Sequence, residues 1–167
     1  MKSKEIEILF LTWIEKLNGE LQLFLFDDLA KLNGKLKLPR CMIKTISSSV
    51  VGKYTNEKKE VGNYIRHFQT SINKNLVTIS ITGSKEEEAA KIRDFFNNNL
   101  TMFWKKKMEK LDITVESVSE LRSLSDSTTS DTIERYVFDI IVRSPEETYT
   151  DIEIIKEVEF AIKQKKE

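Results

Sequence analysis

The chain has 167 residues, 40% of them apolar, which suffices for one hydrophobic core and is too short for two large ones. Its 27 basic and 27 acidic residues cancel, which excludes a generalised polyanion-binding protein, and a single cysteine, Cys41, excludes an internal disulfide framework. We therefore expect one domain over residues 1–167 in a reducing compartment such as the cytoplasm, with a helical segment at 1–34 and an α+β core at 35–167.

The first predicted element is an amphipathic helix near the N-terminus. Its apolar residues recur every three or four positions and form one continuous stripe: Ile6, Leu9, Phe10, Trp13, Ile14 and Leu17. The stretch is shorter than the roughly 20 residues that a bilayer requires. Glu7 interrupts it and no small-residue cleavage site follows, so we predict neither a membrane span nor a signal peptide. Asn18-Gly19 ends the helix.

The next segment is harder to assign. Residues 21–26 fit a helix or a strand equally well, and residues 27–32 fit a helical turn. Residues 42–46 are β-branched and indicate a strand, with 47–49 as a candidate extension. Pro39 is expected at the entrance of this strand, because proline has no amide hydrogen to donate to a central ladder.

Residues 52–62 are predicted to form a charged loop between two strands. Glycine stands at both ends, and lysine and glutamate dominate the interior, which is typical of a solvent-exposed connection. A solvated hairpin tip is the simpler interpretation. The sharper alternative, a contact with a neighbouring subunit or with the tube, is what the family resemblance described below implies, and Lys53, Lys58 and Glu60 are its candidate residues.

Two strands are predicted next, at 63–71 and 76–82. In the second, valine and isoleucine alternate with threonine and serine, which is the period of a strand with one buried face. Asn73-Lys74-Asn75 is compatible with a hairpin, a bulge or an interruption within one long strand, and the pattern does not choose among them.

A second amphipathic helix is predicted to begin at Ser84. Ser84 and Glu87 have the spacing of a capping box, and the glutamates at 86–88 complement the positive end of the helix dipole. The apolar face is expected to lie across a sheet: Ala89, Ile92, Phe95, Phe96, Leu100 and Phe103. Lys105–Lys107 follow, and we interpret them as a solvated helix end, because phosphate binding generally draws on several contacts.

The remaining elements are two strands, a loop and a contested terminus. Strands are expected at 111–115 and 134–142, joined by a Ser/Thr/Asp-rich loop at 122–132. Tyr136, Phe138, Ile140 and Val142 share the core face of the second strand. Arg135 and Asp139 share its other face, where each is placed to pair with the other or with partners across strands. We expect a structural salt bridge there, with a pair between subunits as the alternative.

Residues 151–163 fit both a helix and a strand. Their β-branched side chains favour a strand. An exposed final strand would present an edge that a neighbouring sheet can extend.

The segment from Ser84 to Val158 carries a resemblance to a known family. Four predicted elements follow one another in this segment: a helix ending in Asp94-Phe95-Phe96-Asn97, a strand at Leu111–Val115, the Ser/Thr/Asp loop, and a strand at Glu134–Val142. This ordered combination resembles the tail-terminator (neck-terminator) proteins of tailed bacteriophages and phage-derived contractile particles.

The resemblance implies a fold and a function. The implied fold is α+β, with a mixed or antiparallel β-sheet packed against an amphipathic helix and an additional N-terminal helix. The implied function is structural rather than enzymatic: a hexameric ring that caps the head-proximal end of the tail tube, ends tail polymerisation and joins the tail to the neck or connector.

The implied partners are other copies of the chain, the tail tube, sheath proteins and the neck or connector protein, with no membrane and with nucleic acid disfavoured. The implied locations are the bacterial host cytoplasm during assembly and the tail or neck of the finished particle. A head–tail connector or tail-completion protein is the first alternative, because such proteins form similar rings. A small nucleic-acid-binding α+β module is the second.

Cyclic assembly needs two different contact surfaces on each subunit. The candidate interface residues are Lys53, Lys58, Glu60, Arg122, Asp126, Arg135, Asp139, Glu157 and Glu159. We assign no catalytic, metal or cofactor residues. His67 is the only histidine and lies on a predicted strand, and the glycines follow no phosphate-binding pattern.

Overall fold

The computed structural model describes residues 3–32, 36–52, 55–98, 113–124 and 133–153. Two α-helices, a 3-10 helix and seven strands lie in these ranges. In chain order they are α1 (Ser3–Leu17), β1 (Gln22–Leu25), η1 (Phe26–Leu32), β2 (Arg40–Val50), β3 (Thr55–Val61), β4 (Tyr64–Thr82), α2 (Glu86–Asn97), β5 (Thr114–Val118), β6 (Arg122–Ser123) and β7 (Arg135–Glu153).

All of the described strands belong to one mixed sheet. Its main path runs β1-β2-β4-β7-β5, while β3 pairs with β4 and β6 pairs with β7. The β1–β2 pair is parallel and the others are antiparallel. The predicted α+β class, with a mixed sheet and an N-terminal helix, is confirmed.

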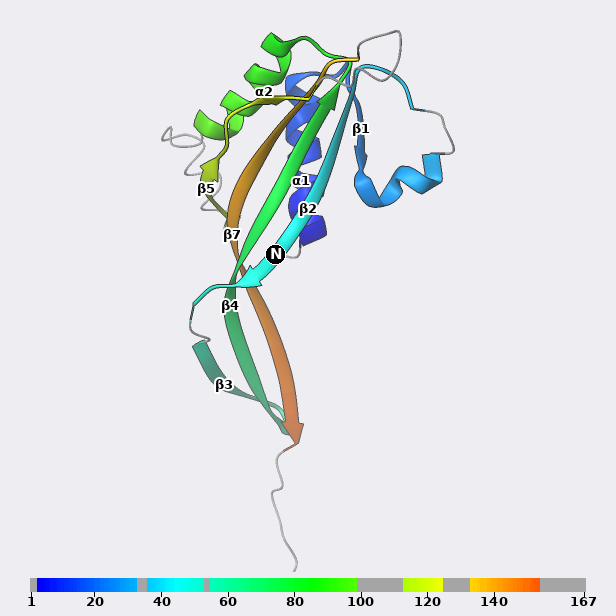
Figure 1. Ribbon diagram of the computed structural model, residues 1–167. Coiled ribbons are helices and arrows are strands. Elements are labelled where there is room, and N and C mark those ends of the chain that lie inside the picture. Colours follow the sequence, from blue (N-terminus) through cyan, green and yellow to red (C-terminus); the bar gives the residue numbers. More distant parts are fainter. Residues whose placement is uncertain (1–2, 33–35, 53–54, 99–112, 125–132, 154–167) are drawn as a thin grey trace, which may run out of the picture.

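Two long strands divide the molecule into two regions. β4 and β7 have 19 residues each and pair from Tyr64↔Glu153 to Thr82↔Arg135 without a break. One half of this ribbon lies in a sheet covered by helices, and the other half projects away from it with β3 alongside (Figure 1). We call the helix-covered half the body. The arm is β3 together with residues 64–73 and 144–153.

The core lies between the helices and one face of the body sheet. Phe10 of α1, Phe96 of α2 and Phe138 of β7 are fully buried, and the Phe10–Phe96 and Phe96–Phe138 ring centroids are 4.8 and 6.3 Å apart. The alternating residues of β4 and β7 meet them: Val77, Ile79, Ile81, Phe138, Ile140 and Val142, all at 0% exposure. The predicted core face of each strand is therefore confirmed.

The predicted helices hold, with corrections at their ends. The α1 stripe is buried as expected except at Leu9, which is partly buried, and at Leu17, which is 46% exposed at the last position of the helix. The expected capping box is wrong: α2 begins at Glu86, and its N-cap residue Lys85 makes no side-chain capping bond. The Ser84 hydroxyl instead donates to the Glu88 carboxylate. Residues 100 and 103 lie outside the described ranges.

The N-terminal segment is not wholly helical as expected. Gln22–Leu25 forms β1, because it pairs in parallel with β2 along Gln22↔Arg40 to Leu25↔Ile43. The helical turn expected at 27–32 is present as η1. β2 begins directly after Pro39 and extends through residues 47–49, as predicted.

The charged loop expected at 52–62 is wrong for most of its length. Thr55–Val61 is strand β3, paired with β4 from Thr55↔Thr70 to Val61↔Tyr64. This ladder satisfies the backbone, while the charged side chains stay in water. β4 also runs through Asn73-Lys74-Asn75 without interruption, so the two strands predicted at 63–71 and 76–82 are one, and none of the three alternatives for these residues is correct.

The C-terminal half differs from expectation in three places. β5 lies at Thr114–Val118, later than the expected 111–115, and Arg122-Ser123 of the expected loop forms the short strand β6. Residues 151–153 are the end of β7 rather than the start of a separate element. Residues 154–163 lie outside the described ranges.

Candidate assembly surfaces

The body sheet has one face that the helices do not cover. On β4, Val77, Ile79 and Ile81 point toward the helices, so Thr78 and Ser80 point the other way. We call this second surface the open face. Charged and hydroxyl side chains from β2, β4, β6 and β7 meet on it.

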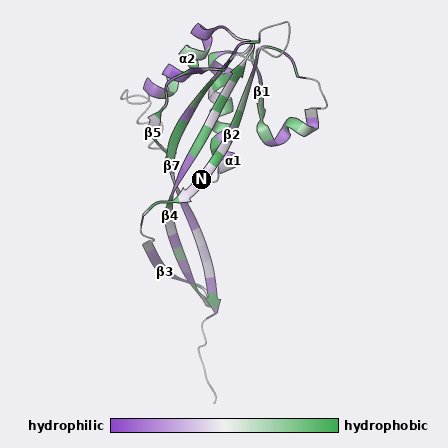
Figure 2. Ribbon diagram, viewed as in Figure 1, coloured by the Kyte–Doolittle hydropathy of each residue, from purple (hydrophilic) through white to green (hydrophobic). Residues whose placement is uncertain are grey.

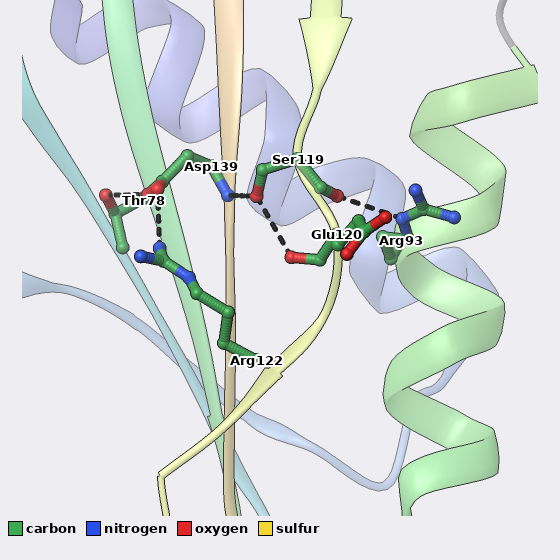
Figure 3. Close-up of polar contacts among 6 residues, drawn as sticks. All are labelled: Thr78, Arg93, Ser119, Glu120, Arg122 and Asp139. Carbon is green, nitrogen blue, oxygen red and sulfur yellow. Dashed lines mark hydrogen bonds and ion pairs between the residues drawn. The ribbon is translucent and has the colours of Figure 1, made fainter.

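Asp139 is the centre of a polar cluster on the open face (Figure 3). The Thr78 hydroxyl donates to its Oδ1 at 2.6 Å, and Arg122 Nη2 donates to its Oδ2 at 2.5 Å. The Asp139 side chain is 26% exposed and that of Arg122 is 56% exposed. One arginine therefore remains largely in water while its position is fixed by a half-buried carboxylate.

The chain between β5 and β6 is held from both sides. The Asp139 amide donates to Ser119 Oγ and the Ser119 amide donates to the Asp139 carbonyl, both at 2.8 Å. On the helix side, Arg93 Nε donates to the Ser119 carbonyl at 3.0 Å. Figure 3 shows this connection from α2 through Ser119 to Asp139. It positions the β6 segment that carries Arg122.

Arg135 and Asp139 do not pair with each other but with partners on other strands, which is the second of the two expected arrangements. Arg135 Nε donates to Ser80 Oγ at 2.9 Å, and Asp139 binds Thr78 and Arg122. Residues four apart on a strand are separated by roughly 13 Å, so contacts across strands prevail. The structure does bring two candidate residues together, Arg122 and Asp139, but as partners within one chain.

A second charged cluster surrounds Glu116, which sequence reasoning missed. Its carboxylate accepts from Lys74 at 3.2 Å and from Arg143 at 2.9 Å. These bonds, first from Arg143 and then from Lys74, lower the pKa of Glu116 below its ordinary value. Glu116 lies at a register irregularity between Val115 and Ser117. No sequence pattern marks such a bulge, because it appears only when β5 pairs with β7.

A cavity of about 480 Å³ lies where η1 packs beside the sheet, and we call it the end pocket. Phe24, Phe26, Leu29 and Met42 are among its apolar lining residues, and the polar ones are Arg40, Arg135, Ser80 and Thr82. Lys44 Nζ lies 3.8 Å from the Phe26 ring centroid and so ties η1 to β2. This pocket was also absent from the sequence-based candidates, except for Arg135.

The arm carries its own cross-strand contacts. Arg66 binds both carboxylate oxygens of Asp151, at 2.7 and 2.8 Å, and these bonds lower the pKa of Asp151. The Phe68 and Tyr149 rings are 6.4 Å apart, with the Arg66 guanidinium 4.5 Å from the Tyr149 ring. An ion pair and an aromatic pair therefore connect β4 to β7 in the arm, outside the hydrophobic core.

The other candidate residues divide into two groups. Lys58 and Glu60 are exposed on β3, pairing through their backbones with His67 and Ile65. Lys53, Asp126, Glu157 and Glu159 lie outside the described ranges. Of the candidates that the structure does place, those on the arm and those on the open face lie in different regions of the molecule.

Within the residues that the structure describes, no three His, Cys, Asp or Glu side chains gather closely enough to hold a metal ion. Neither described α-helix combines the length and the apolar character needed to cross a bilayer.

Two comparisons with known proteins place this geometry in context. A family model described as phage neck terminator protein matches residues 13–166. The match therefore includes the N-terminal half, beyond the Ser84–Val158 segment that carried the resemblance. A search among curated individual proteins gave no match.

Proposed function

Because the chain belongs to the phage neck terminator protein family, we propose that it caps the head-proximal end of the tail tube, ends tail polymerisation and joins the tail to the neck or connector. The family match over residues 13–166 is the observation that carries this proposal. The family is structural rather than enzymatic. In the proposed mechanism complementary surfaces bind, and no bond chemistry is required.

The proposed assembly is a ring, with six copies as the expected number. Its partners are further copies of the chain, the tail-tube protein, sheath proteins where the tail has them, and the neck or connector protein. A ring built by one repeated contact requires two different surfaces on each subunit. The open face and the arm supply two chemically different candidates, which supports the proposal. Assembly would take place in the bacterial host cytoplasm.

The decisive experiment is deletion of the gene in its native phage or particle cluster, with tail lengths measured by electron microscopy. Capping predicts overlong, headless tubes in the deletion strain, and uniform length after the intact gene is restored. Tails of normal length would refute termination. If such tails also lacked heads, the result would favour a connector or tail-completion role instead.

A further inference from the structure

The arm tip and the end pocket lie at opposite ends of the same two strands. Tyr64 pairs with Glu153 at the tip, and Thr82 pairs with Arg135 beside the pocket. With 19 residues between these ends, at a strand rise near 3.3 Å per residue, they are roughly 60 Å apart. The ladder between them is unbroken. The tip of one copy therefore cannot reach its own pocket and is available to another molecule.

The end pocket has the features of a site for a large apolar side chain beside a carboxylate. Phe24, Phe26 and Met42 give it apolar walls, and Arg40 and Arg135 bring two positive charges. Its volume of about 480 Å³ lies within the ordinary range of binding pockets. The bond from Arg135 Nε to Ser80 fixes the plane of that guanidinium before anything binds. Such preorganisation lowers the entropic cost of binding.

The arm tip has the complementary features. Val61 and Tyr64 are 45% and 47% exposed, although both are large apolar side chains. The cross-strand pairs Val61↔Tyr64 and Tyr64↔Glu153 place all three side chains on one face. Gly62, with φ +63, makes the turn between β3 and β4. The tip therefore presents an aromatic and an aliphatic group next to an exposed carboxylate.

The charge of the whole arm agrees with this pairing. Its described residues carry six acidic side chains, Glu57, Glu60, Glu146, Glu147, Asp151 and Glu153, against three basic ones, Lys58, Lys59 and Arg66. The open face beside the pocket has the opposite balance: Arg40, Lys44, Lys74, Arg122, Arg135 and Arg143 against Asp139 and Glu116. Opposite potentials favour encounter in one orientation.

We propose that the arm tip of one copy binds in the end pocket of the next copy, with Tyr64 and Val61 among the apolar walls and Glu153 facing Arg40 and Arg135. Each copy then uses one end as donor and the other as acceptor. Such a head-to-tail contact is heterologous, and it closes into a ring when the rotation between copies permits. The inference rests on the proposed function as an assembly subunit, and specifies its contact.

Disulfide trapping between two variants, each with one added cysteine, tests the contact directly. Val61→Cys marks the tip and leaves Tyr64 in place, and Leu29→Cys marks the pocket. The native Cys41 does not compete, because it is fully buried and burial raises its pKa to about 12. Oxidising the mixed variants is expected to give a covalent dimer and nothing larger, whereas a chain with both substitutions is expected to give a ladder of oligomers.

The matched control replaces the pocket cysteine with Ile46→Cys, at a residue of β2 that is 53% exposed and outside the pocket lining. Little dimer is expected from Val61→Cys mixed with this control, or from either cysteine variant alone. Equal trapping in the control mixture, or no trapping with Leu29→Cys at high protein concentration, would overturn the proposal.

A charge exchange supplies an independent test. Glu153→Arg and Arg40→Glu are each expected to weaken trapping about tenfold, and mixing the two is expected to restore it, because the attraction is then reversed in sign. Tyr64→Ala is expected to weaken it at least as much, since buried aromatic anchors dominate interfaces. Arg40 is preferred to Arg135 here because Arg135 also binds Ser80 within the fold. Failure of the exchange to restore trapping would contradict the pairing of charges.

These results are separable from the proposed function. If trapping fails while the variants still restore tail length in the deletion strain, the contact is wrong and the capping function stands. If trapping succeeds while deletion leaves tail length normal, the copies associate as proposed but do not terminate tails.

Discussion

The body and the arm contain the same two strands in two different environments. In the body, alternate residues of β4 and β7 are fully buried against α1 and α2. In the arm, both faces carry polar side chains, and Tyr149 is 62% exposed (Figure 2). The contrast shows that a ladder established by core packing can continue where no hydrophobic core covers it. The register of β4 against β7 that is set in the body continues unchanged into the arm.

The junction between the two regions is polar and specific. Asn73 and Asn75 occupy the helix-facing positions of β4 where the apolar alternation ends. The Asn73 amide donates to the Glu146 carboxylate across the ladder, and Asn75 Oδ1 accepts from the Ser3 hydroxyl at 3.1 Å. Hydrogen bonds thus replace apolar burial at this point, and α1 begins beside it. Two matched aromatic substitutions, one in the body and one in the arm, test how much each region contributes to the free energy of unfolding.

Phe96→Ala in the body is expected to cost about 3–5 kcal/mol of unfolding free energy, because it empties a fully buried site between Phe10 and Phe138. Phe68→Ala in the arm is the control and is expected to cost about 1 kcal/mol or less, since its main aromatic neighbour is the exposed Tyr149. Chemical denaturation measures both. Equal losses would mean that the arm is part of the cooperative core.

A smaller effect in the body is expected at Glu7. This side chain is 8% exposed, and its Oε1 accepts from the Thr45 amide at 2.6 Å, beside the bulge in the β2–β4 ladder. Glu7→Ala leaves that amide without its acceptor and is expected to cost about 1–3 kcal/mol. Glu7→Gln retains an acceptor oxygen of the same reach, so a much smaller loss is expected in the same denaturation experiment. Equal losses from the two variants would show that the hydrogen bond is not the cause.

The arm is expected to lose stability in acid. The hydrogen bonds from Arg66 lower the pKa of Asp151, so the stabilisation is present above the ordinary carboxyl pKa of about 3.9 and is lost as pH falls through the lowered value. Amide protection factors in the β4–β7 arm ladder should therefore fall as the pH drops through this range. Asp151→Asn is expected to abolish that pH dependence, whereas an unchanged profile in this variant would assign the effect to another group.

The two regions also differ in how far the sequence predicts them. In the body, β4 and α1 each bury one face, so their apolar residues recur with a regular period: they alternate along β4 and repeat every three or four positions along α1. These elements were therefore predictable from the sequence. In the arm, β3 has no buried face, and its Glu57-Lys58-Lys59-Glu60 run has the composition of a loop. Its strand conformation depends on pairing with β4. Local patterns do not contain this information.

The candidate surfaces were predictable only where one strand carried them. Alternation placed Arg135 and Asp139 on a common face away from the core, but their actual partners, Ser80 and Arg122, come from other strands. The end pocket combines η1, β1, β2, β4 and β7 residues that are distant in sequence. The shape of the pocket therefore depends on tertiary packing. The bulge at Glu116, where this side chain bonds to Lys74 and Arg143, also forms only through tertiary packing.

The smallest expected effect on stability is at Lys58 and Glu60, the candidate interface residues placed on β3. Both side chains are exposed, and their strand is held by its backbone ladder to β4. Replacing either by alanine is therefore expected to change the unfolding free energy by no more than about 0.5 kcal/mol. Chemical denaturation measures this, and restoration of tail length in the deletion strain measures assembly. A loss of assembly without a loss of stability would then report a contact made by the arm, because folding would be unaffected. A loss of more than about 1 kcal/mol would contradict the separation between body and arm, since exposed side chains distant from the core would then contribute to folding.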